Sequence, residues 1–164
     1  MKLLNIKISR FTENINGIKL YETENLLVVL LNSVDFILDG ICFINKKYVK
    51  QINIEKSDEL KIKILEHKIN SFHIDSKYKS FETIKDVTDH FLKTNNKLIE
   101  VTLESPDYSI IGNIENSKEK YFIINMLSVK GKYLSEEKIE YEKTRILTVD
   151  SDYLNSLEYY INSN

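Results

Sequence analysis

The sequence is short of several residue types, and each shortage excludes a class of site. Its 164 residues include one cysteine, one proline, four glycines, no tryptophan and no alanine. The lone Cys42 can form neither an intrachain disulfide nor a cysteine-based metal centre. Its neighbours Ile41 and Phe43 are apolar, which predicts a small core residue. Four scattered glycines rule out a P-loop and a dinucleotide fingerprint, and no Gly-x-Ser-x-Gly elbow is present.

Arginine and long apolar runs are also scarce. Arg10 and Arg145 are the only arginines among 23 basic residues, and the formal net charge is −2. A chain with this charge has no long-range attraction to nucleic acid. The longest apolar run, 26–31, is far shorter than the ~20 residues of a membrane-spanning helix. Residues 1–5 carry no secretory signal, so we expect a cytoplasmic protein without a membrane partner.

What is abundant favours strands. Isoleucine, valine, tyrosine and phenylalanine prefer sheets, and the absence of alanine lowers helix propensity. Residues 26–31 are apolar on both faces and predict a central strand. Apolar alternation and turn residues predict the other strands, at 4–8, 18–21, 36–45, 48–54, 61–64, 98–103, 108–114, 121–129 and 139–149.

Two helices are predicted. Ser80 should cap the first, because its hydroxyl can accept from the free N–H groups of a first turn. Four apolar residues then follow at helical spacing, and Asn95 and Asn96 should end this helix; the four are Phe81, Ile84, Val87 and Phe91. Ser151 or Asp152 should cap a short C-terminal helix. The polar stretch 66–79 predicts a junction between an N-terminal β lobe (1–75) and a helix plus a C-terminal β lobe (76–164).

A fifteen-residue segment recurs with an offset of 72 residues. Residues 26–40 read LLVVLLNSVDFILDG, and residues 98–112 read LIEVTLESPDYSIIG, with six identical positions. Each copy is an apolar strand, a Ser-x-Asp-aromatic turn and a second strand broken by glycine. An internal repeat of this kind predicts two similar β units in one chain.

The layout of a helix followed by short antiparallel strands resembles the small barrels of the Sm-like and SH3-like families, here in tandem. Asp35 and Asp107 stand where the Sm pattern has its strand-turn aspartate. Five residues on, the chain has Gly40 and Gly112, and it contains no Arg-Gly pair. The resemblance implies a mainly β (α+β) protein with two antiparallel barrel-like lobes, one mid-chain helix and a short C-terminal helix. It also implies RNA binding as an alternative function.

Two short motifs have the spacing of metal or catalytic sites. His73 and Asp75 could share one face of a strand. Asp150 and Asp152 have the spacing of a divalent-cation pair, although their position before a helix favours capping. Neither motif has further ligands nearby, so we expect no metal, no cofactor and no catalytic residue.

An acidic segment and a group of tyrosines indicate a protein-binding surface. Alternating glutamates suit a face presented to a basic partner, and tyrosine is favoured at interfaces. The residues concerned are Glu136, Glu137, Glu140, Glu142, Tyr153, Tyr159 and Tyr160. The leading hypothesis is a non-enzymatic bacterial protein that binds another protein, such as an immunity protein that neutralises a toxin.

The alternative is nucleic-acid binding. Residues 45–50 mix cations with an aromatic ring, a combination that binds phosphates and stacks on bases. The residues of this alternative site are Lys46, Lys47, Tyr48 and Lys50.

Overall fold

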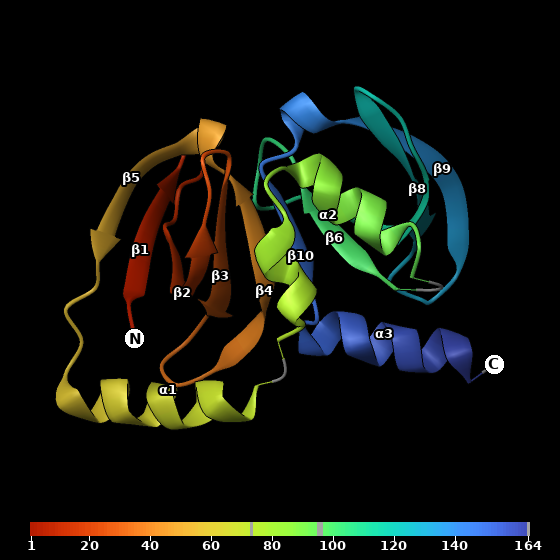
Figure 1. Cartoon of the computed structure of the whole chain (residues 1–164). Coiled ribbons are helices and arrows are strands. Elements are labelled where there is room, and N and C mark those ends of the chain that lie inside the picture. The colour runs from red at the N-terminus through yellow and green to blue at the C-terminus, as the bar shows by residue number, and fades with distance from the viewer. Residues whose placement is uncertain (73, 95–96, 164) are drawn as a thin grey trace.

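The computed structural model describes residues 1–72, 74–94 and 97–163, which form one open antiparallel sheet of ten strands with three α-helices (Figure 1). The strand order is β5-β1-β2-β3-β4-β10-β6-β7-β8-β9. The strands are β1 (Leu3–Ile8), β2 (Ile15–Glu22), β3 (Leu26–Asn32), β4 (Leu38–Asn45), β5 (Val49–Ile54), β6 (Ile99–Thr102), β7 (Ser109–Ser117), β8 (Tyr121–Leu127), β9 (Tyr133–Glu140) and β10 (Ile146–Val149). The helices are α1 (Glu59–Ser71), α2 (Ile84–Phe91) and α3 (Asp152–Asn162), with short 3-10 turns η1 (Lys46–Tyr48), η2 (Ser76–Ser80) and η3 (Tyr141–Lys143).

The predicted pair of Sm-like or SH3-like barrels is wrong, although the α+β class is confirmed. The first half has the order β5-β1-β2-β3-β4 and the second has β10-β6-β7-β8-β9. Closing either half would require its fourth strand to pair with its own fifth strand. Instead β4 pairs with β10, so the two halves merge into a single sheet, and β5 and β9 are left as its two edges.

Strand pairing repeats between the halves without a gap. In the first half Leu4 pairs with Gly17, and in the second half Ile99 pairs with Gly112. Each residue of the first pair lies 95 positions before its counterpart in the second, so Gly17 corresponds to Gly112. The same offset relates β2·β3 to β7·β8, β3·β4 to β8·β9 and β1·β5 to β6·β10, including two of the bulges. Residues 3–54 therefore correspond to 98–149.

This correspondence replaces the repeat predicted from the sequence. Residues 26–40 span β3 and the first three residues of β4, the third and fourth strands of their half, whereas 98–112 span β6 and part of β7, the first and second strands of theirs. The glycines that correspond are Gly17 and Gly112. A Cβ on Gly112 would lie 2.0 Å from the backbone oxygen of Asn125, and one on Gly17 would lie 2.9 Å from Val29. At both places the second strand passes unusually close to the third.

β3 is the central strand that the sequence predicts. Its residues 26–30 are fully buried because both faces of this strand are covered. One face contributes Leu26, Val28 and Leu30 to the core beneath the helices, and the other contributes Leu27 and Val29 to a second core inside the first half. The apolar residues on both faces of β3 thus reflect the burial of both faces.

Two predicted strands are wrong. Residues 139–149 are not one strand, because η3 separates the end of β9 from β10. The proposed strand at 61–64 lies within helix α1. Asp58 caps that helix by accepting from the Lys61 N–H, and the buried Leu65 is its anchor. Lysines at alternate positions imitated strand periodicity in a helix that is mostly exposed.

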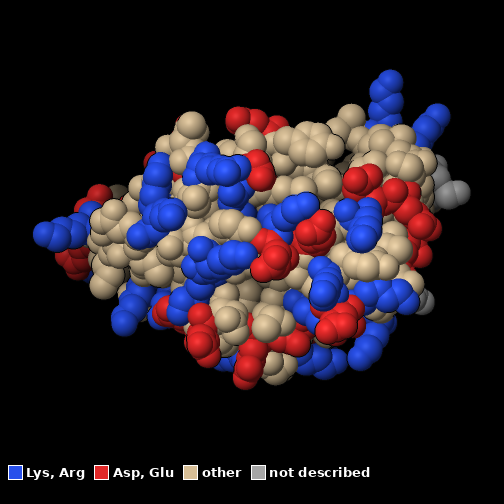
Figure 2. Space-filling view, turned by 90° about the horizontal axis from the view of Figure 1, so that it is seen from above, with Lys and Arg blue, Asp and Glu red and all other residues tan. Residues whose placement is uncertain are grey.

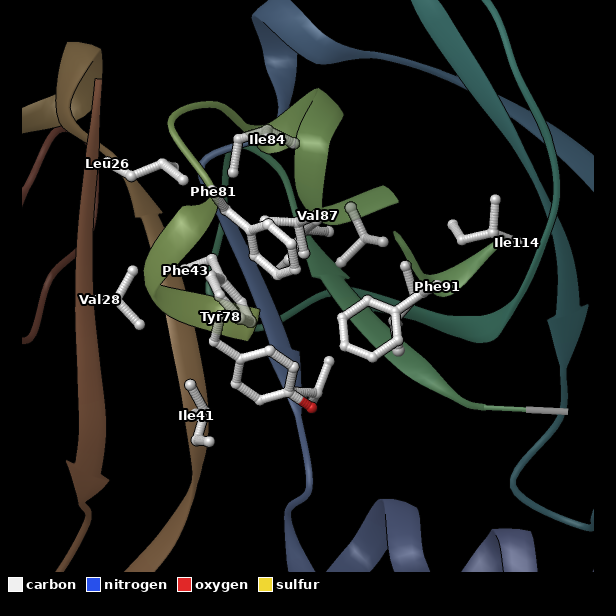
Figure 3. Packing of buried hydrophobic residues seen from close by; sticks show 14 of the residues in the cluster. Leu26, Val28, Ile41, Phe43, Tyr78, Phe81, Ile84, Val87, Phe91 and Ile114 are labelled. Carbon is white, nitrogen blue, oxygen red and sulfur yellow. The ribbon is translucent and has the colours of Figure 1, made fainter. Parts of the chain in front are cut away.

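Helix α2 lies in the hollow of the second half and also covers the junction between the halves (Figures 1 and 3). Three residues of the predicted stripe, Ile84, Val87 and Phe91, are buried on α2. The fourth, Phe81, is buried just after η2 and before the helix begins. The predicted cap is wrong: Thr83, not Ser80, caps α2, in a reciprocal capping box with Asp86. Ser80 ends η2 instead. The predicted stop at Asn95 and Asn96 falls outside the described residues.

Aromatic side chains fix η2 and α2 on the sheet. Tyr78 meets Phe43 of β4 edge-on with ring centroids 5.5 Å apart, and Phe81 lies 5.9 Å from the same ring (Figure 3). Since Phe43 and Leu147 are cross-strand neighbours in β4 and β10, this cluster covers the junction from one side. The opposite side of the junction is thereby left for other contacts.

Helix α3 begins as predicted, with Ser151 as its cap. Leu154 packs against Leu98 and Leu127 beneath the second half. No helix among the described residues is long and apolar enough to cross a membrane.

Candidate protein-binding groove

The junction strands build the floor of a groove on the face opposite α2. Thr148 of β10 is paired with Cys42 of β4 on one side and with Glu100 of β6 on the other. Successive side chains of a strand point to opposite faces, and the neighbouring residues Phe43 and Leu147 belong to the core under the helices. Cys42, Thr148 and Glu100 therefore form a row on the other face.

Loops from both halves form the walls. Residues 11–14 of the β1–β2 connection and Ile15 at the start of β2 contribute one wall. Pro106 and Asp107 of the β6–β7 turn contribute another, together with Tyr153 at the start of α3. The groove they enclose has a volume of about 640 Å³, which is in the size range of pockets that hold a small molecule or a few side chains of a partner. Because its floor is a sheet, its shape exists before any partner arrives.

The charge of this groove has one sign. Four carboxylates line it: Glu13, Asp39, Glu100 and Asp107. No lysine, arginine or histidine is among the described residues of its lining. Asp39 also accepts from the backbone N–H of Asp152 at 2.7 Å, which holds it at the start of α3. The groove thus combines negative charge with apolar residues, among them Ile146 in the floor and Phe11 in the wall.

Cys42 lies in the groove floor but is not a nucleophile. Its side chain is 3% exposed, and its sulfur lies 3.4 Å from the Thr148 hydroxyl. Burial, together with the charges of Glu100 and Asp39, raises the pKa of the Cys42 thiol to about 12. A thiol in this state is protonated at neutral pH and unreactive, in keeping with its prediction as a core residue.

The predicted tyrosines do not form one cluster. Tyr153 stands in the wall of the groove, and together with Glu100 it also lines an adjoining pocket of about 270 Å³. Tyr159 is the most exposed of the three, at 76%. Tyr160 packs at the β8–β9 turn, where a Cβ on Gly131 would lie 2.6 Å from its ring. Of these three tyrosines, Tyr153 is the one that lines the groove.

The predicted acidic segment lies elsewhere. Glu136, Glu137 and Glu140 are exposed on the edge strand β9. Glu142 lies on η3 and forms an ion pair of 3.3 Å with Lys47 of η1. The structure therefore places these glutamates on a different surface from the acidic groove.

The predicted basic cluster is largely engaged within the protein. Lys46 pairs with Glu22 at 2.7 Å, and Lys47 pairs with Glu142. The hydroxyl of Tyr48 donates to the backbone oxygen of Glu142, and Lys50 is exposed on β5. Seen from above, lysines and carboxylates are interspersed rather than gathered by sign (Figure 2).

A second hollow, of about 820 Å³, lies beside η3. Its lining combines three lysines with three glutamates: Lys118, Lys120, Lys138, Glu119, Glu140 and Glu142. Since the charges balance, this hollow favours neither a basic nor an acidic partner. Its larger volume therefore does not make it a better candidate for the binding site than the acidic groove.

The motifs considered for metals have other roles where the structure describes them. His73 lies outside the described residues, and Asp75 caps η2 by accepting from Lys77. Asp150 forms an ion pair of 2.7 Å with Lys97 and accepts from the Tyr78 hydroxyl. No group of three or more potential ligands suited to a metal ion occurs among the described residues.

Sequence reasoning missed the carboxylates of the groove. They come from the β1–β2 loop, β4, β6 and the β6–β7 turn, which only the β4·β10 pairing brings together. Glu100 left a weak signal, as an acidic residue on a strand interior whose neighbours Ile99 and Val101 are apolar.

Comparison with known proteins gives no relative: no family model matches the chain, and no curated protein or solved structure matches it either.

Proposed function

We propose that this chain is a non-enzymatic binding protein whose partner is another protein with a basic segment. The observation that carries the proposal is the groove at the junction of the halves, with its four carboxylates and no cation among the described lining residues. A lysine or arginine side chain entering it would meet opposite charge from several directions.

The groove has the mixture of properties that supports protein recognition. Its carboxylates attract a basic partner and orient it during encounter. The ring of Tyr153, which is 47% exposed, supplies area that can be desolvated on contact. The shielded Cys42 thiol offers no covalent chemistry there.

The biological role that we propose for this binding is neutralisation of a toxin, as in a bacterial immunity protein. Toxins that act on nucleic acid carry basic surfaces, because they must bind phosphates. An acidic groove of fixed shape is complementary to such a surface. The nucleic-acid-binding alternative has less support, since Lys46 and Lys47 already pair with carboxylates of this chain.

The test is capture of partners from the source cell by three matched forms of the protein. The first is the wild type. The second neutralises the groove by Glu13→Gln, Glu100→Gln and Asp107→Asn. The third is a control with the same charge change outside the groove and away from both edge strands, by Glu24→Gln, Glu82→Gln and Glu119→Gln.

A protein retained at near-equal amount by the wild type and the control, and lost with the neutralised groove, is the expected result. Equal retention by all three forms, or loss only with the control, would move the interface away from the groove. Retention of nuclease-sensitive nucleic acid in place of a protein would overturn the proposal.

A further inference from the structure

At the junction, the fourth strand of one half pairs with the fifth strand of the other half. β4 is the fourth strand of the first half, and β10 is the fifth strand of the second. Cys42 is paired with Thr148 and Ile44 with Ile146. Beyond them, the backbone N–H of Asn45 donates to the Arg145 oxygen at 2.8 Å.

The same two kinds of strand form the free edges of the sheet. β9 corresponds to β4, and β5 corresponds to β10, with the constant offset of 95 residues. Seven of the eight β9 residues and five of the six β5 residues are exposed. An edge strand has a row of unpaired backbone groups that can accept a further strand. The two edges of the sheet are therefore strands of the same two kinds that already pair with each other inside the molecule, at the β4·β10 junction.

We propose that β9 of one copy pairs antiparallel with β5 of a second copy, in the register of the β4·β10 junction. In that register Glu137 faces Asn53 of the second copy, as Cys42 faces Thr148. Glu140 then faces Lys50, as Asn45 faces Arg145. This interaction is separate from the groove and does not rest on the proposed function.

Charge complementarity supports this pairing. The β9 edge presents Glu136, Glu137 and Glu140, whereas β5 carries Lys50 and no carboxylate. Opposite charges directly across a strand pair stabilise it, and like charges destabilise it. Charged residues also protect an edge from adventitious pairing, but here the register places one pair of opposite charges, Glu140 and Lys50, directly across from each other.

Apolar exposure on β5 supports it too. Ile52 is 39% exposed and Ile54 is 67% exposed. Their counterparts at the internal junction are Leu147 and Val149, and both are fully buried. A neighbouring β9 would cover Ile52 and Ile54 with the backbone and side-chain stems of Lys138 and Glu136.

A join of this kind is head-to-tail, because different surfaces of the two copies meet. It leaves one free edge at each end of every pair, so the assembly grows with concentration until it closes or becomes a filament. The expected species is thus a concentration-dependent series, not a single dimer.

Sedimentation velocity over a wide concentration range at low salt tests the proposal. The wild type should rise from the 19.3 kDa monomer to at least twice that mass. Either Lys50→Glu or Glu140→Lys should weaken association by about tenfold, because each places like charges opposite one another. The double variant Lys50→Glu with Glu140→Lys should recover association, since the pair is restored with its signs exchanged.

Lys79→Glu, an exposed change on η2 away from both edges, is the control, and it should assemble as the wild type does. Circular dichroism establishes that each variant is folded. A wild type that stays monomeric at every concentration would overturn the proposal, and so would a double variant no better than the single ones.

Discussion

The guanidinium of Arg145 lies over the ring of Tyr48, with its central carbon 4.6 Å from the ring centroid. Arg145 belongs to the second half and Tyr48 to η1 of the first, so the contact crosses the junction. Arg145 also donates to the Leu103 oxygen at 2.7 Å, and it is only 4% exposed. One of the two arginines in the chain therefore joins the halves beside the hydrogen bonds between β4 and β10.

Removing the ring should loosen this junction. Tyr48→Leu abolishes the stacking and should lower the free energy of unfolding by about 1–2 kcal/mol. Tyr48→Phe keeps the ring and loses only the hydrogen bond to the Glu142 oxygen, so its effect should be smaller. Urea unfolding of the two variants measures the difference, and equal losses would show that the ring contributes nothing to stability.

The two corresponding glycines should be unequally sensitive. Gly112→Ala forces its Cβ against the backbone of β8, which cannot move without disturbing the sheet, and should cost about 2–3 kcal/mol. Gly17→Ala would place its Cβ 2.9 Å from the side chain of Val29 and 3.0 Å from the backbone oxygen of Leu30. Because this approach is less severe than the 2.0 Å contact at Gly112, the substitution should cost less. Ser109→Ala, on the same strand as Gly112, is the control and should be nearly neutral. A Gly112→Ala variant as stable as the wild type would contradict the close approach of β7 and β8.

The cap of α2 can be located by a pair of substitutions. Thr83→Ala removes both the hydroxyl that accepts from the Asp86 N–H and the capping box, and it should destabilise the protein by about 1 kcal/mol. Ser80→Ala removes a hydroxyl that donates to the Lys77 oxygen within η2 and should have less effect. Thermal unfolding ranks the two, and the reverse order would restore Ser80 as the cap.

The ion pairs of Lys97 predict a dependence on alkaline pH. Burial lowers the pKa of Lys97, but its hydrogen bond with Asp150 and the charges of Asp150 and Glu158 outweigh burial and raise the pKa above its ordinary value. Because this pKa is higher in the folded than in the unfolded protein, the protonated Lys97 contributes to the free energy of unfolding. The contribution is complete below the unfolded lysine pKa of about 10.4, and it is lost as the pH rises through the pKa of the folded state.

Lys97→Met should therefore lower the unfolding free energy at pH 7, where it leaves Asp150 and Glu158 without their cation. Its deficit relative to the wild type should shrink as the pH rises above about 10.4. Urea midpoints at neutral and alkaline pH measure this deficit. A deficit that is the same at both would mean that Lys97 acts by packing and not by charge.

Cys42 should be slow to react in the folded protein. Its high pKa and burial leave almost no accessible thiolate at pH 8, so a disulfide reagent should label it only after unfolding. The control is the same reaction in denaturant, which should be complete within the mixing time of the assay. Fast labelling of the native protein would reopen the thiol as a functional group.

Local features of this fold could be predicted from the sequence. The apolar run at 26–31 indicated a strand covered on both faces, and the stripe of α2 was readable from its spacing. The strand predicted at 61–64 was wrong. Lysines alternating with isoleucines have the period of two that is typical of a strand, but the same residues can also lie on a mostly exposed helix. No local pattern distinguishes a strand from a helix here, because Leu65 is the one residue of α1 described as buried.

Long-range pairing could not be predicted. Sequence similarity aligned residues 26–40 with 98–112, whereas the strands themselves correspond with an offset of 95. Few identities remain at that offset, because the counterparts of Ile41 and Phe43, which α2 and η2 cover, are Glu136 and Lys138 on an exposed edge. The groove depends on the same pairing of β4 with β10, so its carboxylates could not be recognised as a set.

Calorimetric titration with a lysine-rich extended peptide shows whether the acidic groove binds a basic protein segment. The wild type and the Glu24→Gln, Glu82→Gln, Glu119→Gln control should bind this peptide equally, with an affinity that falls with salt. The Glu13→Gln, Glu100→Gln, Asp107→Asn form should bind at least tenfold more weakly, and a glutamate-rich peptide of the same length should not bind. Equal affinity of the two triple variants, or no binding of the basic peptide at low salt, would mean that the groove does not bind a basic segment.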